Sequence, residues 1–455
     1  MPKPSKITLG HVRSSKGLMV GAALALLVPA FADDWALWMG PRRDDVWRES
    51  GIIEKFPAAG AKFLWRQEIG AGFATPAVSG GRVFIADRVT PPDTSRPKNP
   101  FTTDRIPGNE RVLCLDAKDG AILWKQEYDC PYTVSYAAGP RVMPQVNNGH
   151  VFTLGTMGDL LCLNARTGEK IWEKDFKKDY DLKIPLWGCA ANPLLDGDKL
   201  VCLAGGESGR VVALDQATGK ELWRAVPAKE IGYCPPVIYD INGRRQLIIW
   251  HPGAVVGLDP ENGQVLWTNA WAIRSELSVA IPRQSGNDLF FTAFYNGSQL
   301  LRFSPGKAEP DVVWRTQKAS ERDTTHLNSI ISTPFVEDGY VYGACSYGQF
   351  RCLNLETGER IWETLVPTGG QEARWATTFV TKNGPRFFLF NEKGDLLIAR
   401  LSSKGYEEIS RAHILDPLNP DPGRLVVWSH PAFANRRLFA RNDKELVCVD
   451  LAAGK

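Results

Sequence analysis

The stretch LLCLNARTGEKIWEKDF, residues 160–176, decides the fold, because related segments recur along the chain. Most of them contain a Cys or another small apolar residue, then Asn or Asp, then Gly, and close on Trp. A period of roughly 40–50 residues with four strand-like runs per unit is typical of a β-propeller blade. Seven such segments, spaced 44 to 51 residues apart, end at Trp124, Trp172, Trp223, Trp267, Trp314, Trp362 and Ile409.

Each repeat has an upstream half that predicts a β-hairpin. Eight segments, from TPAVSGGRVFIAD (75–87) to HPAFANRRLFARN (430–442), place a Gly, Asn or Asp turn between two apolar runs. We assign these runs to the two inner strands of a blade and the opening stretch to the two outer strands. The sequence therefore predicts an all-β fold, an eight-bladed β-propeller with four-stranded antiparallel blades, over residues 61–455.

The two ends of this region predict how the ring closes. AKFLWRQEIG (61–70) reads as a fourth strand with no third strand before it, and LVCVDLAAGK (446–455) reads as a third strand with no fourth after it. One blade shared between these N- and C-terminal strands would leave no open sheet edge between them.

The residues that recur in each repeat have structural interpretations. Asn164 can accept backbone hydrogens in the turn between the outer strands, and Gly168 can supply a left-handed backbone. A Trp on the fourth strand can bury its ring between blades while its N–H reaches a backbone carbonyl. We therefore assign a structural docking role to Trp65, Trp124, Trp172, Trp223, Trp267, Trp314 and Trp362.

The nine cysteines also follow the repeat. Cys114, Cys162, Cys352 and Cys448 share one repeat position, where other blades have Ala or Gly, so a small apolar residue suffices there. One disulfide is compatible with the repeat pattern, between Cys189 and Cys234, because these two residues precede the first strands of consecutive blades. No CxxC motif occurs, so no metal site is expected from cysteine.

The N-terminus predicts an export signal. Residues 1–32 carry four Lys or Arg and no acid, then the apolar run LMVGAALALLVPA and AFA at Ala30–Ala32. The run is too short to span a bilayer comfortably. The net charge of the whole chain is +3. Because the four Lys or Arg of residues 1–32 account for this excess, the rest of the chain is close to neutral, and nothing indicates nucleic-acid binding. We expect a signal peptide at 1–32, an N-terminal extension at 33–60, a periplasmic or secreted location, no membrane span and a monomer.

The chain resembles a known family. Segments such as ALDQATGKELW (213–223) are similar to the repeat of PQQ-like (quinoprotein-type) β-propellers, which include BamB-like proteins and quinoprotein alcohol dehydrogenases. The resemblance implies a PQQ site with calcium in the dehydrogenases, often with an adjacent Cys pair on the quinone or a CxxCH haem segment. This sequence has neither Cys motif, and it lacks the lipid-attachment Cys that the resemblance to BamB implies.

Residues that differ between blades are the candidates for function. The insertion at 88–110 in the first blade is expected to run over one face, either as a functional segment or as a tolerated surface loop. The connections from the fourth strand of one blade to the first of the next should line one mouth of the channel, as a funnel for an anionic, planar or sugar-like ligand. Their candidate ligand-binding residues are Tyr136, Arg141, Trp187, Asn192, Arg274, Glu276, His326, Asn328, Glu372, Arg374, Trp375, Trp428 and His430.

The sequence is compatible with two functions. The first is a binding or scaffold propeller that contacts a protein, peptide or glycan partner at one mouth, with no firmly implied cofactor. The alternative is a PQQ-dependent alcohol or sugar dehydrogenase, in which Arg274 and Arg374 would hold PQQ. Glu276 or Glu372 would then be a calcium ligand or base. The sequence assigns no catalytic residue.

Overall fold

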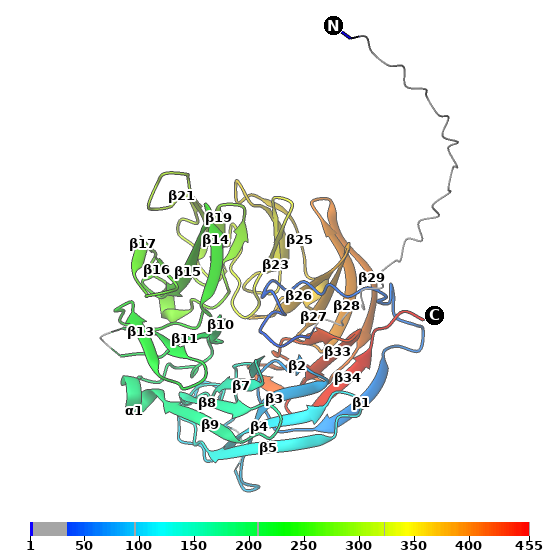
Figure 1. Cartoon of the computed structure of the whole chain (residues 1–455). Coiled ribbons are helices and arrows are strands. Elements are labelled where there is room, and N and C mark those ends of the chain that lie inside the picture. The colour runs from blue at the N-terminus through cyan, green and yellow to red at the C-terminus, as the bar shows by residue number, and fades with distance from the viewer. Residues whose placement is uncertain (3–33, 95–96, 207–208, 323, 455) are drawn as a thin grey trace. The chain divides into compact units, whose positions relative to one another are not determined.

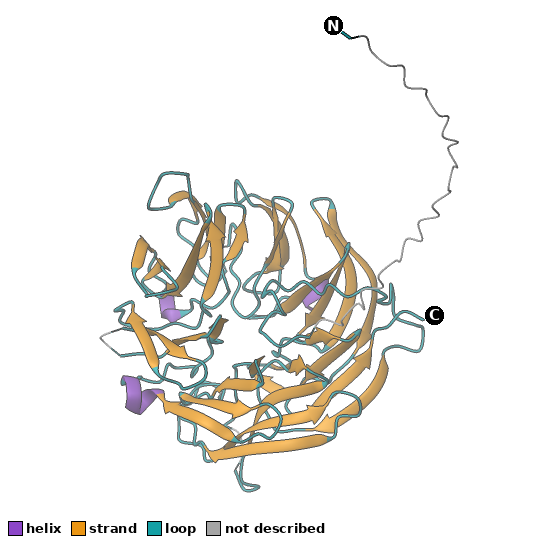
Figure 2. Ribbon diagram, in the orientation of Figure 1, coloured by secondary structure: helices purple, strands orange, loops and turns teal. Residues whose placement is uncertain are grey.

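Eight four-stranded antiparallel sheets are arranged around a centre, as the sequence predicts (Figures 1 and 2). The computed structural model describes residues 1–2, 34–94, 97–206, 209–322 and 324–454. The expected signal peptide at 1–32 lies almost wholly outside these residues. Across the described ranges, no helix is long and apolar enough to cross a membrane.

The first four blades follow one another along the chain, each with its strands hydrogen-bonded in sequence order. Their strands are β2 Ala77–Ser79, β3 Arg82–Val89, β4 Asn109–Asp116, β5 Ile122–Asp129; β6 Gln145–Asn147, β7 His150–Leu154, β8 Asp159–Asn164, β9 Lys170–Asp175; β10 Leu194–Asp196, β11 Lys199–Leu203, β12 Val211–Asp215, β13 Glu221–Ala225; β14 Val237–Ile241, β15 Arg244–His251, β16 Ala254–Leu258 and β17 Val265–Ala270. A short helix, α1 (Phe176–Tyr180), follows β9.

Blades five to eight repeat this order, and the eighth closes the ring. Their strands are β18 Arg283–Ser285, β19 Asp288–Ala293, β20 Gly297–Arg302, β21 Asp311–Arg315; β22 Phe335–Glu337, β23 Tyr340–Ala344, β24 Phe350–Asn354, β25 Arg360–Thr364; β26 Thr378–Asn383, β27 Arg386–Asn391, β28 Asp395–Ser402, β29 Gly405–His413; β32 Ala432–Ala434, β33 Arg437–Arg441, β34 Glu445–Asp450 and β1 Lys62–Glu68. Single 3₁₀ turns lie at η1 (Arg274–Glu276) and η2 (Val366–Thr368), and the hairpin β30–β31 (Asn419–Asp421, Arg424–Val426) precedes blade eight.

The predicted ring closure is confirmed. The first strand of the propeller, β1, pairs antiparallel with the last, β34, so that Trp65 lies opposite Cys448. Because the two ends of the propeller share one sheet, blade eight cannot form until both ends of the region have come together.

The recurring Trp contacts the following blade. Trp124 Nε1 donates to the Ala165 carbonyl at 3.1 Å, and its ring covers Gly168, whose φ is +77°. A Cβ at Gly168 would lie 2.6 Å from that ring, so this turn requires glycine for both backbone and space. The same bond to a carbonyl of the next blade is made by Trp65, Trp172, Trp314 and Trp362.

Two of the seven tryptophans depart from this pattern. Trp223 Nε1 is buried without a hydrogen-bond partner. Trp267 donates instead to the Gln246 side chain of its own blade at 2.6 Å. In the next blade the residue at the position of Ala165 is Phe303, and its carbonyl accepts from Asn242 Nδ2 at 3.1 Å instead of from Trp267.

The small residue of the repeat faces the Trp across the sheet. Cys162 pairs with Trp172 in the β8–β9 register, and Gly257 pairs with Trp267 in β16–β17. All nine cysteines are buried and free. The disulfide considered between Cys189 and Cys234 is therefore absent, and both thiols are buried in different core clusters.

Adding a methyl group at Gly257 is expected to destabilise the fold. A Cβ there would lie 2.2 Å from the Trp267 ring, so Gly257→Ala should displace the indole from Gln246 and lower the free energy of unfolding by about 1–3 kcal/mol. Urea unfolding followed by far-UV circular dichroism measures this. Ala213→Cys, at the same repeat position in blade three, should change stability by less than about 1 kcal/mol. Equal effects of the two substitutions would contradict this explanation.

The extension before the propeller lies at the centre of the ring (Figure 1). Trp35 forms a bridge with Val78 of β2, and Ala36 accepts a backbone hydrogen bond from Val146 of β6 at 3.0 Å. Trp47 donates its backbone N–H to Lys382 of β26 at 2.7 Å. The extension therefore contacts the innermost strands of several blades and fills part of the channel with its own side chains.

Candidate functional site

A cavity of about 350 Å³ opens at the mouth formed by the connections between blades. Every one of the eight connections contributes at least one side chain, because each ends where an innermost strand begins. The extension, the blade-one insertion and the β19–β20 turn complete the wall. The lining is dominated by aromatic rings: Trp38, Phe73, Phe101, Tyr136, Trp187, Tyr233, Tyr295, Trp375, Phe379 and Trp428.

Eight of the thirteen residues predicted for this funnel line the cavity. They occupy four of the connections and include both cations of the wall. They are Tyr136, Arg141, Trp187, Asn192, Arg374, Trp375, Trp428 and His430.

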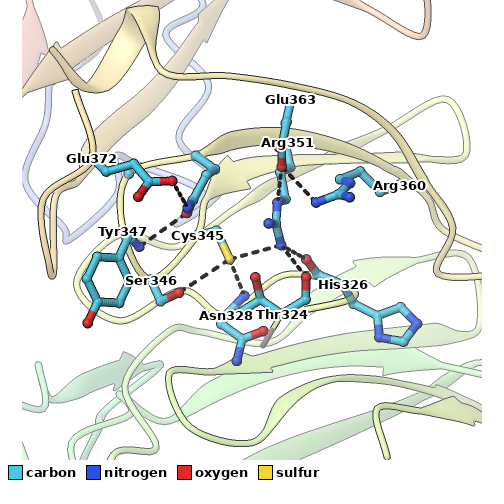
Figure 3. Close-up of polar contacts among 12 residues, drawn as sticks. Thr324, His326, Asn328, Cys345, Ser346, Tyr347, Arg351, Arg360, Glu363 and Glu372 are labelled. Carbon is cyan, nitrogen blue, oxygen red and sulfur yellow. Dashed lines mark hydrogen bonds and ion pairs between the residues drawn. The ribbon is translucent and has the colours of Figure 1, made fainter. Parts of the chain in front are cut away.

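Two predicted residues lie instead in a structural network around Arg351 (Figure 3). Arg351 Nη1 donates to the carbonyls of Thr324 and His326, and the His326 ring stacks on Trp314 with centroids 4.9 Å apart. Asn328 is buried and donates to the Phe294 carbonyl at 2.8 Å. The prediction that His326 and Asn328 line the funnel was wrong, because their connection turns them toward the sheets.

The predicted carboxylates are also outside the cavity. Glu372 is exposed and accepts a hydrogen bond from Gln349 at 3.1 Å (Figure 3). Glu276 ends the η1 turn, where burial and nearby Glu230 raise its pKa. Arg274 of the same turn is exposed, and its guanidinium lies over the Tyr295 ring, 4.7 Å from the ring centroid. The tight turn points Ser275 and Leu277 inward and these two charges outward.

Sequence reasoning left the role of the insertion open and did not name Phe101 as part of the wall. Phe101, at its tip, packs edge-to-face on Tyr136 and Trp375, with centroids 5.4 and 5.8 Å apart. Its neighbour Pro100 accepts a hydrogen bond from the Tyr136 backbone. The insertion thus spans from blade one to the connection before blade seven. Its single aromatic residue among Pro, Thr and charged residues was the available signal.

Two aromatic residues of the wall have strained backbones. Tyr136 and Trp375 have φ of +53° and +65°, in the left-handed region that bulky residues avoid. Such strain costs about 1–3 kcal/mol per residue and concentrates at functional sites. The Trp375 N–H is held by the Ser346 carbonyl at 2.9 Å, so the ring is fixed at the mouth.

The two cations of the wall differ in their partners. Arg141 donates to the carbonyls of Gly139, Ser135 and Tyr136, and burial lowers its pKa. Arg374 lies over the Trp375 ring at 4.4 Å and forms an ion pair with Glu321. Carbonyls orient Arg141 without neutralising it, whereas Arg374 shares its charge with a carboxylate behind the wall.

An acidic network supports the wall from behind. Glu392 accepts from Trp428 Nε1 at 2.9 Å and from Arg424 Nε at 2.8 Å. Tyr136 donates its hydroxyl to Asp421 at 2.8 Å, and Asp421 also pairs with Arg424. Burial raises the Asp421 pKa, and its contact with Tyr136 opposes this. These carboxylates hold the Trp428 and Tyr136 rings in place, and their oxygens are engaged in these hydrogen bonds and ion pairs.

At the base of the cavity, residues of the extension contact the connection that leads into blade eight. Trp38 lines the cavity, and buried Asp45 lies 3.2 Å from His430 Nε2. His430 Nδ1 donates to the Pro431 carbonyl at 2.7 Å. The extension therefore supplies both an apolar surface and a buried carboxylate at the base of the cavity.

The fold and mouth define a propeller of the PQQ-repeat class. Residues 108–364 and 268–455 match the family of outer membrane protein assembly factor BamB, so the chain belongs to that family. It is 33% identical over 271 residues to quinohemoprotein alcohol dehydrogenase ADH-IIG of Pseudomonas putida, covering 57% of this chain but only 30% of the dehydrogenase.

Two further relatives carry the BamB name. The chain is 23% identical to the BamB of Shewanella oneidensis over 66% of this chain and 68% of that protein. The crystal structure of BamB from Moraxella catarrhalis covers 86% of this chain and 99% of that one, with 16% identity and a TM-score of 0.54. At that identity the structural likeness shows the fold alone.

The cavity does not provide the donors that PQQ with calcium requires. Calcium prefers several oxygen ligands, mostly carboxylates, yet no Asp or Glu lines the cavity. Three carboxylates behind the wall, Glu321, Glu392 and Asp421, already pair with arginines, and Asp45 at the base lies against His430. Within the described ranges no group of three or more His, Cys, Asp or Glu could hold a metal.

Proposed function

We propose that this protein is an exported, monomeric binding propeller that receives part of a protein, peptide or glycan partner in its aromatic cavity. The observation that carries the proposal is a largely apolar cavity of about 350 Å³, with fixed rings and two arginines at its mouth. Binding sites are typically concave and mostly apolar, with a few placed polar groups. Membership of the BamB family and the expected export signal support the proposal.

Panning a random peptide library and probing a glycan array with the purified protein tests this function. We expect ligands whose binding is lost in Trp375→Gly, because this variant removes a cavity ring. It should remain folded, because glycine tolerates the φ of +65°. Ile361→Ala, on the outer strand β25 and 40% exposed, is the control and should retain binding. Ligands that bind both variants as well as the wild type, or none at all, would overturn the proposal.

The alternative of a quinoprotein dehydrogenase rests on the 33% identity to ADH-IIG. Because the cavity offers no free carboxylate, we expect no saturable PQQ binding in equilibrium dialysis with calcium, and no dye-linked oxidation of alcohols or sugars. The absorbance of dialysed PQQ and a dye-reduction assay measure these. Stoichiometric PQQ binding that is lost in Arg374→Ala would contradict the prediction and favour the dehydrogenase.

A further inference from the structure

We propose, building on the proposed function, that the partner is a polypeptide that inserts an aromatic side chain, with an acidic residue beside it, into the cavity. The reasons are the size of the cavity, the absence of carboxylates from its lining and its positive charge.

The size and surface of the cavity suit an aromatic side chain. About 350 Å³ accommodates one large ring with its neighbouring backbone. Phe101, Trp187, Tyr233 and Trp375 offer ring edges and faces at one mouth. Aromatic pairs add about 0.5–1.5 kcal/mol beyond the burial of apolar area. Phe101 is still 40% exposed, so a partner can bury it further.

The lining discriminates against sugars. A sugar hydroxyl needs acceptors as well as donors, and carboxylate and amide groups usually supply the acceptors. The Asn192 carbonyl oxygen already accepts from the Met143 backbone N–H at 2.9 Å, and Tyr136 donates its hydroxyl to Asp421. With no carboxylate in the lining, a bound sugar would lack its usual strong acceptors, and each hydroxyl desolvated without a partner would cost about 1–3 kcal/mol.

The charge of the wall favours an anion beside the ring. Among the described residues, Arg141 forms hydrogen bonds only to carbonyls and has no ion pair. The hydrogen bonds of Arg374 to Glu321 use Nε and Nη2, so Nη1 can turn to a second acceptor. Guanidinium N–H groups donate strong hydrogen bonds to carboxylates, and Nη1 of each arginine has a hydrogen that none of these bonds uses. Both arginines lie next to aromatic residues of the lining, which places the acid beside the inserted ring.

Isothermal titration calorimetry with short synthetic peptides tests the inference on the full chain. The probe is an acetylated and amidated Gly-Ser-Glu-Phe-Glu-Ser-Gly, with matched peptides in which Phe becomes Ala or both Glu become Gln. We expect the probe to bind, and each matched peptide to bind about tenfold or more weakly. The affinity for the probe should fall similarly in Trp375→Gly and Arg374→Gln. Arg360→Gln, on the outer strand β25, is the matched control and should bind like the wild type.

Two results would overturn this inference. One is equal affinity for the three peptides. The other is binding of a probe glycan, maltoheptaose, that is lost in Trp375→Gly while the peptides do not bind. The second result would leave the proposed binding function intact and replace only the class of partner, whereas the absence of any cavity-dependent ligand in the library screens would remove both. Thermal unfolding of each variant verifies that it is folded.

Discussion

Trp47→Ala is expected to lower the free energy of unfolding by about 3–5 kcal/mol. Trp47 is 1% exposed, and its ring packs on Phe388 and Phe433, with centroids 5.4 and 5.1 Å away. These two residues lie on β27 and β32, so one side chain of the extension joins blades seven and eight. Removing it leaves a large cavity between two sheets. Urea unfolding monitored by circular dichroism measures the loss.

The control for this prediction is Trp47→Phe, which keeps a ring and should cost clearly less than the alanine variant. The indole N–H has no partner, so its removal should not add a hydrogen-bond penalty. A change below about 1 kcal/mol in Trp47→Ala would show that the extension is not part of the propeller core. The neighbouring Trp38 lines the cavity, so loss of the extension should also weaken ligand binding.

The fold could be predicted from the sequence because each blade repeats the same short sequence pattern. Gly168 indicates an outer turn and Trp172 indicates a fourth strand, and equivalent residues recur at a regular spacing along the chain. Because a blade buries its faces against its neighbours, counting the repeats gives the architecture. Even the closure between β1 and β34 follows from one strand missing at each end.

The extension could not be predicted in the same way. Trp35, Met39 and Trp47 are buried at the centre of the ring, yet they belong to no repeat and no periodic strand. Their positions depend on contacts with strands far along the chain, such as that between Trp47 and Lys382. A high content of tryptophan at 35–47 indicated burial but not its location.

The candidate site could be predicted only in part, for a related reason. The connections between blades share a mouth, so naming them was sufficient to locate Tyr136, Trp375 and Trp428. Which side chains of a connection point inward depends on its local turns. The turn at 274–276 directs Ser275 to the cavity and Glu276 away from it, and no periodic pattern in the sequence predicts such a turn. Phe101 comes from an insertion, whose path over the mouth is set by tertiary contacts.

Glu110→Leu is expected to lower the free energy of unfolding by about 2–4 kcal/mol. Glu110 on β4 is 2% exposed. Its carboxylate accepts hydrogen bonds from the hydroxyls of Tyr128 and Tyr132 and from the Thr156 backbone N–H at 2.9 Å. Leucine has a similar volume but no acceptor, so it would leave the Tyr128 hydroxyl and the Thr156 N–H unsatisfied, while the Tyr132 hydroxyl keeps Thr156 Oγ1 at 2.7 Å. Urea unfolding of the variant measures the effect.

Glu110→Gln separates the hydrogen bonds from the packing, because the amide keeps one acceptor oxygen. We expect an intermediate loss of stability for this variant. Tyr132 begins the connection that carries Tyr136 and Arg141 to the cavity, and burial beside Glu110 raises its pKa well above the usual range. A loosened Tyr132 should therefore also weaken peptide binding at the mouth. If Glu110→Leu were as stable as the wild type, the network would not support this wall, and the cavity would depend on the aromatic packing of Phe101, Tyr136 and Trp375 alone.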